Sequence, residues 1–155
     1  MEQHIHDDKR YGLMTTLPDS ARSFEHLTAP LRLSLESTNR IREEALKTSR
    51  ETIQLSSRAI RALHRGHTEE ATVHIAAARA CVERAKAACA SNPEVFYAGY
   101  IHDSQKEYVE AETMFAIVTD LPVPGAATLG VEPAAFLNGI AEAASECRRF
   151  VLDNV

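Results

Sequence analysis

Acidic side chains interrupt an apolar face on a long predicted helix in the second half of the chain. Steps of three and four residues from Tyr100 to Leu121 stay on one side of a helix, since each residue turns by about 100°. The C-terminal half of this line is apolar and is expected to face the core, while its middle holds Asp103, Glu107 and Glu110. Carboxylates clustered on a packing face repel one another and lose hydration, so they need protons, basic partners or a metal ion as compensation.

The last predicted helix carries a matching pair, Glu142 and Glu146, spaced four residues apart. Gly139 on the same line would let the backbone of another helix approach closely. If the two helices pack antiparallel, we expect Glu107 and Glu110 to meet Glu142 and Glu146. Hard oxygen donors of this kind suit Mg²⁺ or Mn²⁺.

Two other interpretations of the glutamates stay open. A ferritin-like di-iron site needs Glu-x-x-His on two helices. The predicted helices contain Glu107-x-x-Glu110 and no Glu-x-x-His, which makes di-iron the weaker metal hypothesis. The glutamates could also be solvated or paired with arginines such as Arg149, and would then need no ligand.

Helical patterns cover the chain after a polar N-terminal tail, residues 1–17, which we predict to be disordered. A helical region begins near Pro18 or Ser20. Pro30 is expected to interrupt it or to lie in the first turn of a new helix, which continues to about Arg65. The remaining predicted helices span about 68–90, 93–121 and 132–155.

Capping residues separate these helices. Gly66 is the expected C-cap of the first long helix and Thr68 the N-cap of the next. Asn92 caps a third helix that has Pro93 at its first position, and residues 122–131 form a loop. Because no alternating β-pattern or solenoid repeat is present, residues 18–155 are predicted to form an all-α antiparallel bundle of four to five long helices.

The composition fits one soluble helical domain. The chain has 155 residues, of which 45% are hydrophobic and 25% charged. It lacks a stretch of about 18 uncharged apolar residues that could span a bilayer. It also lacks an apolar signal-peptide region, and its three cysteines are dispersed without a Cys-x-x-Cys motif. We therefore expect a cytoplasmic protein with reduced cysteines and no membrane contact.

Charge is divided unevenly along the chain. Residues 31–65 contain eight basic and four acidic residues, whereas residues 94–155 contain three basic and ten acidic residues. This division suggests a contact with a polyanion in the first segment and a separate carboxylate site in the second. Long solvated helices that carry charges of both signs are the alternative explanation.

Several short segments resemble the translin family. Residues 105–111 read QKEYVEA, which is similar to the Gln-Glu-Tyr-(Ile/Val)-Glu-Ala signature of the branch of translin-associated factor X (Trax) and its archaeal relatives. The segments IREE, LHRG and FYAGY precede it at family-like positions, and LGVEP, FLNGI and ASECRR follow it in the family order. The resemblance covers about residues 24–155 and is closer to Trax than to translin itself.

The resemblance implies an all-α protein that forms a hollow, roughly octameric homo-oligomeric shell and binds single-stranded RNA or DNA. Trax-type subunits cut RNA at a metal-dependent carboxylate site. The two signature glutamates correspond to Glu107 and Glu110, and the third acid, an Asp in the family, corresponds to Glu142. Glu146 corresponds to a further family glutamate, with Ser145 in place of a glycine. The resemblance thus implies Glu107, Glu110 and Glu142 as catalytic residues, and these three with Glu146 as ligands of Mg²⁺ or Mn²⁺.

Basic side chains would hold the strand by phosphate contacts, which weaken as salt rises. The candidates for nucleic-acid binding are Arg40, Arg42, Lys47, Arg50, Arg148 and Arg149. Translin proper uses a basic segment at the start of the third helix, but residues 100–104 contain no arginine here, so binding is expected to be weaker or differently placed. Family members also continue through further helices, which makes this chain look truncated at its C-terminus.

The sequence is compatible with three functions. The first is a magnesium-dependent endoribonuclease that acts on single-stranded RNA. The second is a non-catalytic RNA- or DNA-binding subunit of a translin-like shell. The third is a structural helical oligomer whose acids are only solvated.

Overall fold

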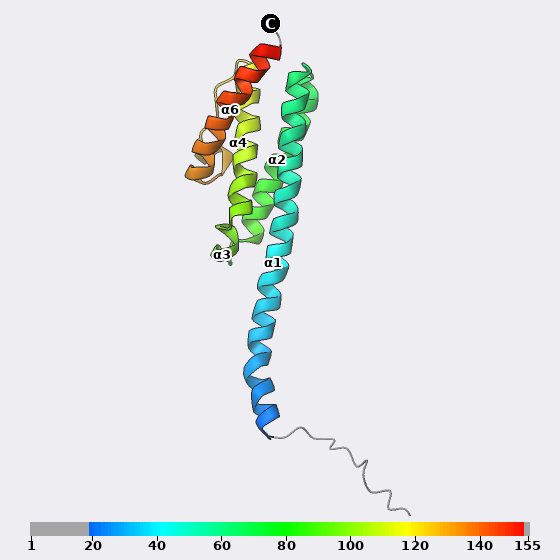
Figure 1. Ribbon diagram of the computed structural model, residues 1–155, viewed down its shortest axis with the longest axis vertical. Helices are drawn as coiled ribbons and strands as arrows, with labels where there is room; N and C mark the ends of the chain where they lie inside the picture. Colours follow the sequence, from blue (N-terminus) through cyan, green and yellow to red (C-terminus); the bar gives the residue numbers. More distant parts are fainter. Residues whose placement is uncertain (1–18, 154–155) are drawn as a thin grey trace, which may run out of the picture. The chain divides into compact units, whose positions relative to one another are not determined.

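The computed structural model describes residues 19–153, which contain six α-helices and no β-strand (Figure 1). The helices are α1 (Asp19–His64), α2 (Thr68–Ala88), α3 (Pro93–Phe96), α4 (Gly99–Val118), α5 (Ala126–Leu129) and α6 (Pro133–Asp153). The predicted all-α class is confirmed. The tail that we predicted to be disordered lies outside the described residues. None of the described helices is long and apolar enough to cross a membrane.

The chain divides into two compact units, of which the first ends at Ser37. Its described part is the N-terminal stretch of α1, where Arg32 lies 3.7 Å from Glu25 and 3.9 Å from Glu36. Pro30 lies inside this helix, so the predicted interruption is wrong. Pro30 is exposed, and water can therefore hydrate the carbonyl that lost its hydrogen-bond donor.

The second unit, from Thr38 to the end of the chain, begins with the remainder of α1. Gly66 ends this helix as predicted, with a φ of +71°. The amides of Gly66 and His67 donate to the carbonyls of Leu63 and Ala62, both at 2.9 Å, which is the Schellman pattern. Thr68 is not the N-cap of α2, because that position belongs to His67 and Thr68 is the first helical residue.

The helix predicted from Pro93 to Leu121 is interrupted early. Asn92 and Pro93 begin a helix as expected, but α3 ends at Phe96. Ala98 then has an extended backbone (φ −71°, ψ 146°), and α4 starts at Gly99. Within the loop predicted for residues 122–131, residues 126–129 form the short α5.

Helices α1, α2 and α4 alternate in direction, whereas α6 runs parallel to α4 (Figure 1). His102 contacts Asn138, and Lys106 contacts Glu142 one turn further along both helices. The antiparallel packing that the sequence suggested for this pair is therefore wrong. Residues 119–132 return the chain to the beginning of α4, where the amide of residue 132 donates to the side chain of Gln105 at 2.9 Å.

A glycine sets the close contact between α4 and α6. A Cβ atom built on Gly139 would lie 2.6 Å from the carbonyl oxygen of Lys106 and 2.6 Å from Cβ of Val109. Ala135 and Ala143, one turn to either side, are completely buried. This small-residue seam brings the two backbones together and fixes which side chains of α4 and α6 lie opposite each other.

Most core side chains of α4 lie beside the line that carries the acids, but Met114 on that line is also completely buried in the core. Tyr108 and Ala111 are completely buried, and Phe115 packs against the same cluster. Further along that line, Ile117 and Leu121 are 52% and 54% exposed, so the expectation that its C-terminal half faces the core is correct for Met114 and wrong for these two residues. At Glu107 and Glu110 the line borders a pocket.

Candidate metal and nucleic-acid site

Three carboxylates from α4 and α6 meet beside the glycine seam. Glu107, Glu110 and Glu142 each offer one oxygen, and these oxygens all lie within 4.8 Å of one another. Each of the three residues is partly buried. The structure thus brings together the three glutamates that the sequence selected, although the helices run parallel. Asp103, on the same line of α4, is exposed and stays outside the group.

Lys106 contacts two members of this group. Its Nζ donates to Oε1 of Glu142 at 2.8 Å and lies 3.5 Å from Oε1 of Glu107. The hydrogen bond that Lys106 donates to Glu142 is the main reason why the pKa of Lys106 is raised, with the charge of Glu107 adding to it. The ammonium therefore stays protonated and supplies part of the positive charge that the carboxylates require.

Glu110 is the carboxylate that this lysine compensates least. Burial is the main cause that raises its pKa to about 7, and the negative charges of Glu107, Glu142 and Glu146 add to the effect. Lys106 opposes the shift only in part. Near neutral pH the Glu110 carboxyl therefore exchanges between its protonated and ionised forms, as expected where one more positive charge could be bound.

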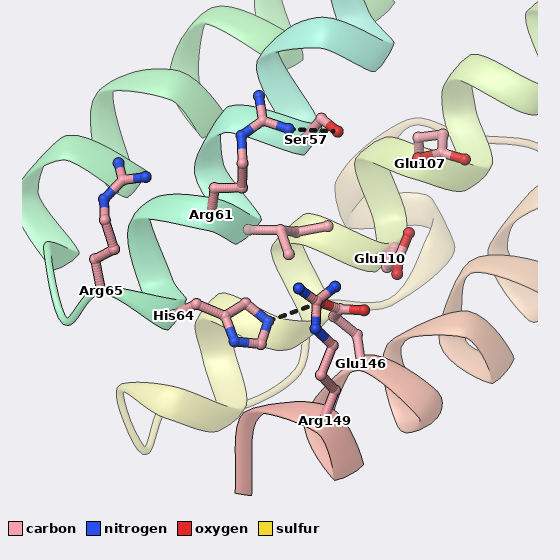
Figure 2. A pocket seen from close by; sticks show the side chains of 9 residues that line it. Ser57, Arg61, His64, Arg65, Glu107, Glu110, Glu146 and Arg149 are labelled. Atoms are coloured by element: carbon pink, nitrogen blue, oxygen red, sulfur yellow. Dashed lines mark hydrogen bonds and ion pairs between the residues drawn. The ribbon is translucent and has the colours of Figure 1, made fainter. Parts of the chain in front are cut away.

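A pocket of about 580 Å³ opens in front of Glu107 and Glu110 (Figure 2). Its opposite wall comes from α1, and α6 supplies the remaining side. The polar residues that line it are Ser57, Arg61, His64, Arg65, Glu107, Glu110, Glu146 and Arg149. One wall is thus acidic, and three arginines from the other two helices border it. Such a pocket can accept a metal ion on one side and a phosphate on the other.

Glu146 is held by a histidine from α1. The Nε2–H of His64 donates to Oε1 of Glu146 at 2.6 Å, and Nδ1 of the same ring lies 3.3 Å from Oδ2 of Asp153 (Figure 2). The ring also packs against Phe150, with 5.7 Å between centroids. Glu146 therefore lines the pocket and affects Glu110, but it is not one of the three converging ligands.

The predicted nucleic-acid-binding residues lie mostly away from this pocket. Arg40, Arg42, Lys47 and Arg50 are exposed on α1 but do not line it. On α6, Arg149 lines the pocket and Arg148 does not. Phosphate binding by these six residues stays a prediction.

Sequence reasoning missed the pocket wall at the end of α1. It is formed by Ser57, Arg61 and His64 of this helix and by Arg65 directly after it. Ser57, Arg61 and His64 are three or four positions apart, and Arg65 is four positions after Arg61, so this helical spacing was visible in the sequence. What the sequence lacked was an indication of which side of α1 turns toward the acids.

Tyr108 of the QKEYVEA segment and the adjacent Glu112 stabilise the packing of α4. Glu112 is buried and accepts hydrogen bonds from the Tyr108 hydroxyl at 2.6 Å and from Arg79 of α2 at 2.9 Å. Arg79 also donates to the Tyr108 oxygen at 2.8 Å. Burial, together with the hydrogen bond to Glu112, raises the pKa of Tyr108. This network fastens α4 to α2 behind the carboxylate group.

Solved C3PO structures are similar to this chain. The crystal structure of AfC3PO matches with a TM-score of 0.74 and 35% identity, covering 81% of this chain and 65% of its own. The AfC3PO complex with duplex RNA matches with a TM-score of 0.71 and 35% identity, covering 81% and 64%. Apo-NeC3PO, at 18% identity and a TM-score of 0.74, supports the fold alone, covering 91% of this chain and 70% of its own. No family model and no curated protein sequence matches.

Proposed function

Because this chain is a translin-like protein, we propose that it binds single-stranded RNA and cleaves it at a divalent-metal site formed by Glu107, Glu110 and Glu142. The observation that carries the proposal is the convergence of three carboxylate oxygens within 4.8 Å at the edge of a pocket with a cationic opposite wall. Glutamates that repel one another are expected to converge only where cations or protons compensate their charge, and Lys106 compensates only part of it.

The donor set fits Mg²⁺ or Mn²⁺. Both ions prefer hard oxygen ligands, and Glu107, Glu110 and Glu142 offer only carboxylates. A bound divalent ion would activate water and stabilise negative charge on a phosphodiester. Because Glu110 must be ionised to act as a ligand, we expect metal binding to release the proton that its carboxyl holds near neutral pH.

The other pocket residues have roles in holding the RNA. Arg61 on α1, Arg65 directly after it and Arg149 on α6 lie where they can donate to phosphate oxygens across from the acids. His64 fixes the carboxylate of Glu146 at the wall of the pocket by its 2.6 Å contact. These contacts orient a phosphate toward Glu107 and Glu110 without reading the bases, so we expect little sequence preference.

A non-catalytic RNA- or DNA-binding subunit of an oligomeric shell is the second candidate. It is favoured by the contact of Lys106 with Glu142 and Glu107, since a lysine already neutralises part of the group without a metal ion. The chain also spans only 64–65% of the AfC3PO chains, one of which was solved with duplex RNA. We retain single-stranded RNA as the proposed substrate and use duplex RNA as a competitor in the test.

The test is cleavage of end-labelled single-stranded RNA in Mg²⁺, in Mn²⁺ and in EDTA. We expect cleavage in either metal and none in EDTA, and a decrease of about 100-fold or more for Glu110→Gln, as for loss of a group that acts on the transition state. Glu83→Gln, an exposed glutamate of α2, is the matched control. Equal cleavage by wild type and Glu110→Gln would show that the carboxylate site does not cut the RNA, and it would exclude the proposed nuclease mechanism.

Filter binding of the same RNA over a salt series separates the second candidate from a purely structural protein. Salt-sensitive retention without metal-dependent cleavage would establish a binding subunit. If the filter retains no RNA even at low salt, both the nuclease and the non-catalytic binding subunit are excluded. Duplex RNA and single-stranded DNA of the same sequence, measured in parallel, test the strand preference.

A further inference from the structure

Lys106 occupies the space that the converging carboxylates share. Its ammonium contacts Glu142 at 2.8 Å and Glu107 at 3.5 Å, and it comes from the residue directly before Glu107. The side chain is only 20% exposed, so it is directed into the group instead of into bulk water. This lysine therefore contacts two of the three carboxylates that a metal ion would use, and it competes with the ion for them.

One ammonium cannot satisfy three carboxylates. It brings a single positive charge and contacts two members, while Glu110 receives no hydrogen bond from it. A divalent ion brings twice the charge and binds carboxylate oxygens at about 2.0–2.1 Å for Mg²⁺. The ion would bind the same Glu142 carboxylate that now accepts from Lys106, and two cations this close repel strongly in a partly buried site.

We propose that Lys106 is a displaceable internal cation, which holds Glu142 and Glu107 in the metal-free protein and leaves them when a divalent ion binds. This inference rests on the proposed function, because it assumes that the three glutamates take a metal ion. A lysine suits this role since its ammonium is strongly hydrated and moves on a flexible four-carbon stem. The lysine stabilises the three carboxylates while no metal ion is bound. Because it competes with the ion for Glu142 and Glu107, it weakens metal binding.

The first experiment measures Mn²⁺ binding by isothermal titration calorimetry at pH 8. Lys106→Met removes the charge and retains most of the apolar stem. We expect the variant to bind Mn²⁺ about ten times more tightly than wild type, which corresponds to about 1.4 kcal/mol. Its melting temperature should be lower than that of wild type in EDTA and should rise more on addition of Mn²⁺. Lys86→Met, an exposed lysine of α2, is the matched control and should change neither quantity.

A second experiment needs no variant and therefore does not depend on the folding of Lys106→Met. Reductive methylation of the wild-type protein, followed by mass spectrometry of its peptides, reports how accessible each lysine amine is. We expect methylation of Lys106 to be slow in EDTA and several times faster with saturating Mg²⁺. Lys86 in the same sample should react at the same rate in both conditions.

The outcomes distinguish this inference from the proposed function. Wild type that binds Mn²⁺ without tighter binding by Lys106→Met, and without faster methylation of Lys106 in Mg²⁺, would overturn the displacement and leave the metal site standing. Failure of both wild type and Lys106→Met to bind Mn²⁺ would overturn the metal site and the displacement together. Tighter binding by the variant with faster methylation of the wild-type lysine supports both.

Discussion

Glu110 illustrates how a single side chain can make the stability of this protein depend on pH. Its pKa in the folded protein is about 7, above the ordinary value of 4.5, mainly because of burial and then because of Glu107. The folded state therefore favours the protonated carboxyl. Protonated Glu110 contributes its full share to the stability of the folded state below about pH 4.5, and this contribution is lost as the pH rises through 7.

Glu110→Gln should remove this dependence. Because glutamine stays neutral, we expect the variant to be more stable than wild type at pH 8 by about 1–2 kcal/mol, a value reduced to allow for solvent screening. At pH 4.5 the two proteins should differ little. Urea unfolding in EDTA at both pH values measures the difference, with Glu83→Gln as the control. A difference that is the same at pH 4.5 and pH 8 would contradict the assignment of the titration to Glu110.

The side chains of His64 and Glu146 should be energetically coupled to each other. Both side chains are largely buried, and they join α1 to α6 over a separation of 82 residues. Removal of either partner leaves the other poorly solvated, so each alanine variant should lose about 1–3 kcal/mol of unfolding free energy. In the double-mutant cycle of His64→Ala and Glu146→Ala, we expect a coupling of about 1 kcal/mol. Additive losses would show that the two side chains do not depend on each other.

At the scale of elements, Gly139 links packing to chemistry. Alanine at this position would place a Cβ 2.6 Å from the backbone oxygen of Lys106, which forces α4 and α6 apart. We expect Gly139→Ala to cost about 1–3 kcal/mol in stability, as for other overpacked sites. Mn²⁺ affinity should fall as well, since Glu142 on α6 would move away from Glu107 and Glu110 on α4.

A second glycine provides the control for this element. A Cβ on Gly99 at the start of α4 meets nothing within 4 Å, and its φ is not positive. Gly99→Ala should therefore be neutral or slightly stabilising, because alanine has the higher helix propensity. Chemical denaturation and Mn²⁺ titration of both variants make the comparison. Equal effects of the two substitutions would mean that the α4–α6 distance does not control the site.

The same elements show what the sequence could and could not predict. Helical spacing was enough to place Glu107 and Glu110 on one face, and the small size of Gly139 was enough to predict a close helix contact. The direction of α6 was not predictable, because it depends on where residues 119–132 return the chain and on the contact at Gln105. The side of α1 that faces the acids was missed for a related reason, since periodicity gives the spacing of a face and not its neighbour.

At the scale of the whole molecule, the N-terminal stretch of α1 carries a surface that the described chain leaves open to solvent. Phe24, Leu27, Leu31 and Leu35 recur every three or four residues and are between 64% and 71% exposed. Contiguous apolar side chains of this size are uncommon on a monomeric soluble protein and are typical of interfaces. We therefore propose that this stripe supports the homo-oligomer that the translin resemblance implies.

The paired substitution Leu27→Glu with Leu31→Glu tests this assembly, because burying two carboxylates at a subunit contact is costly. We expect wild type to have a mass several times 17.1 kDa in multi-angle light scattering, and the double variant to approach the monomer mass. Leu33→Glu is the control, since Leu33 is also 63% exposed but projects away from the stripe, about 140° from Leu27 and Leu31 on average. Loss of assembly by Leu33→Glu alone would show that the stripe is not the interface. A monomeric wild type would show that this surface does not assemble the chain, and RNA cleavage would then have to be carried out by single subunits.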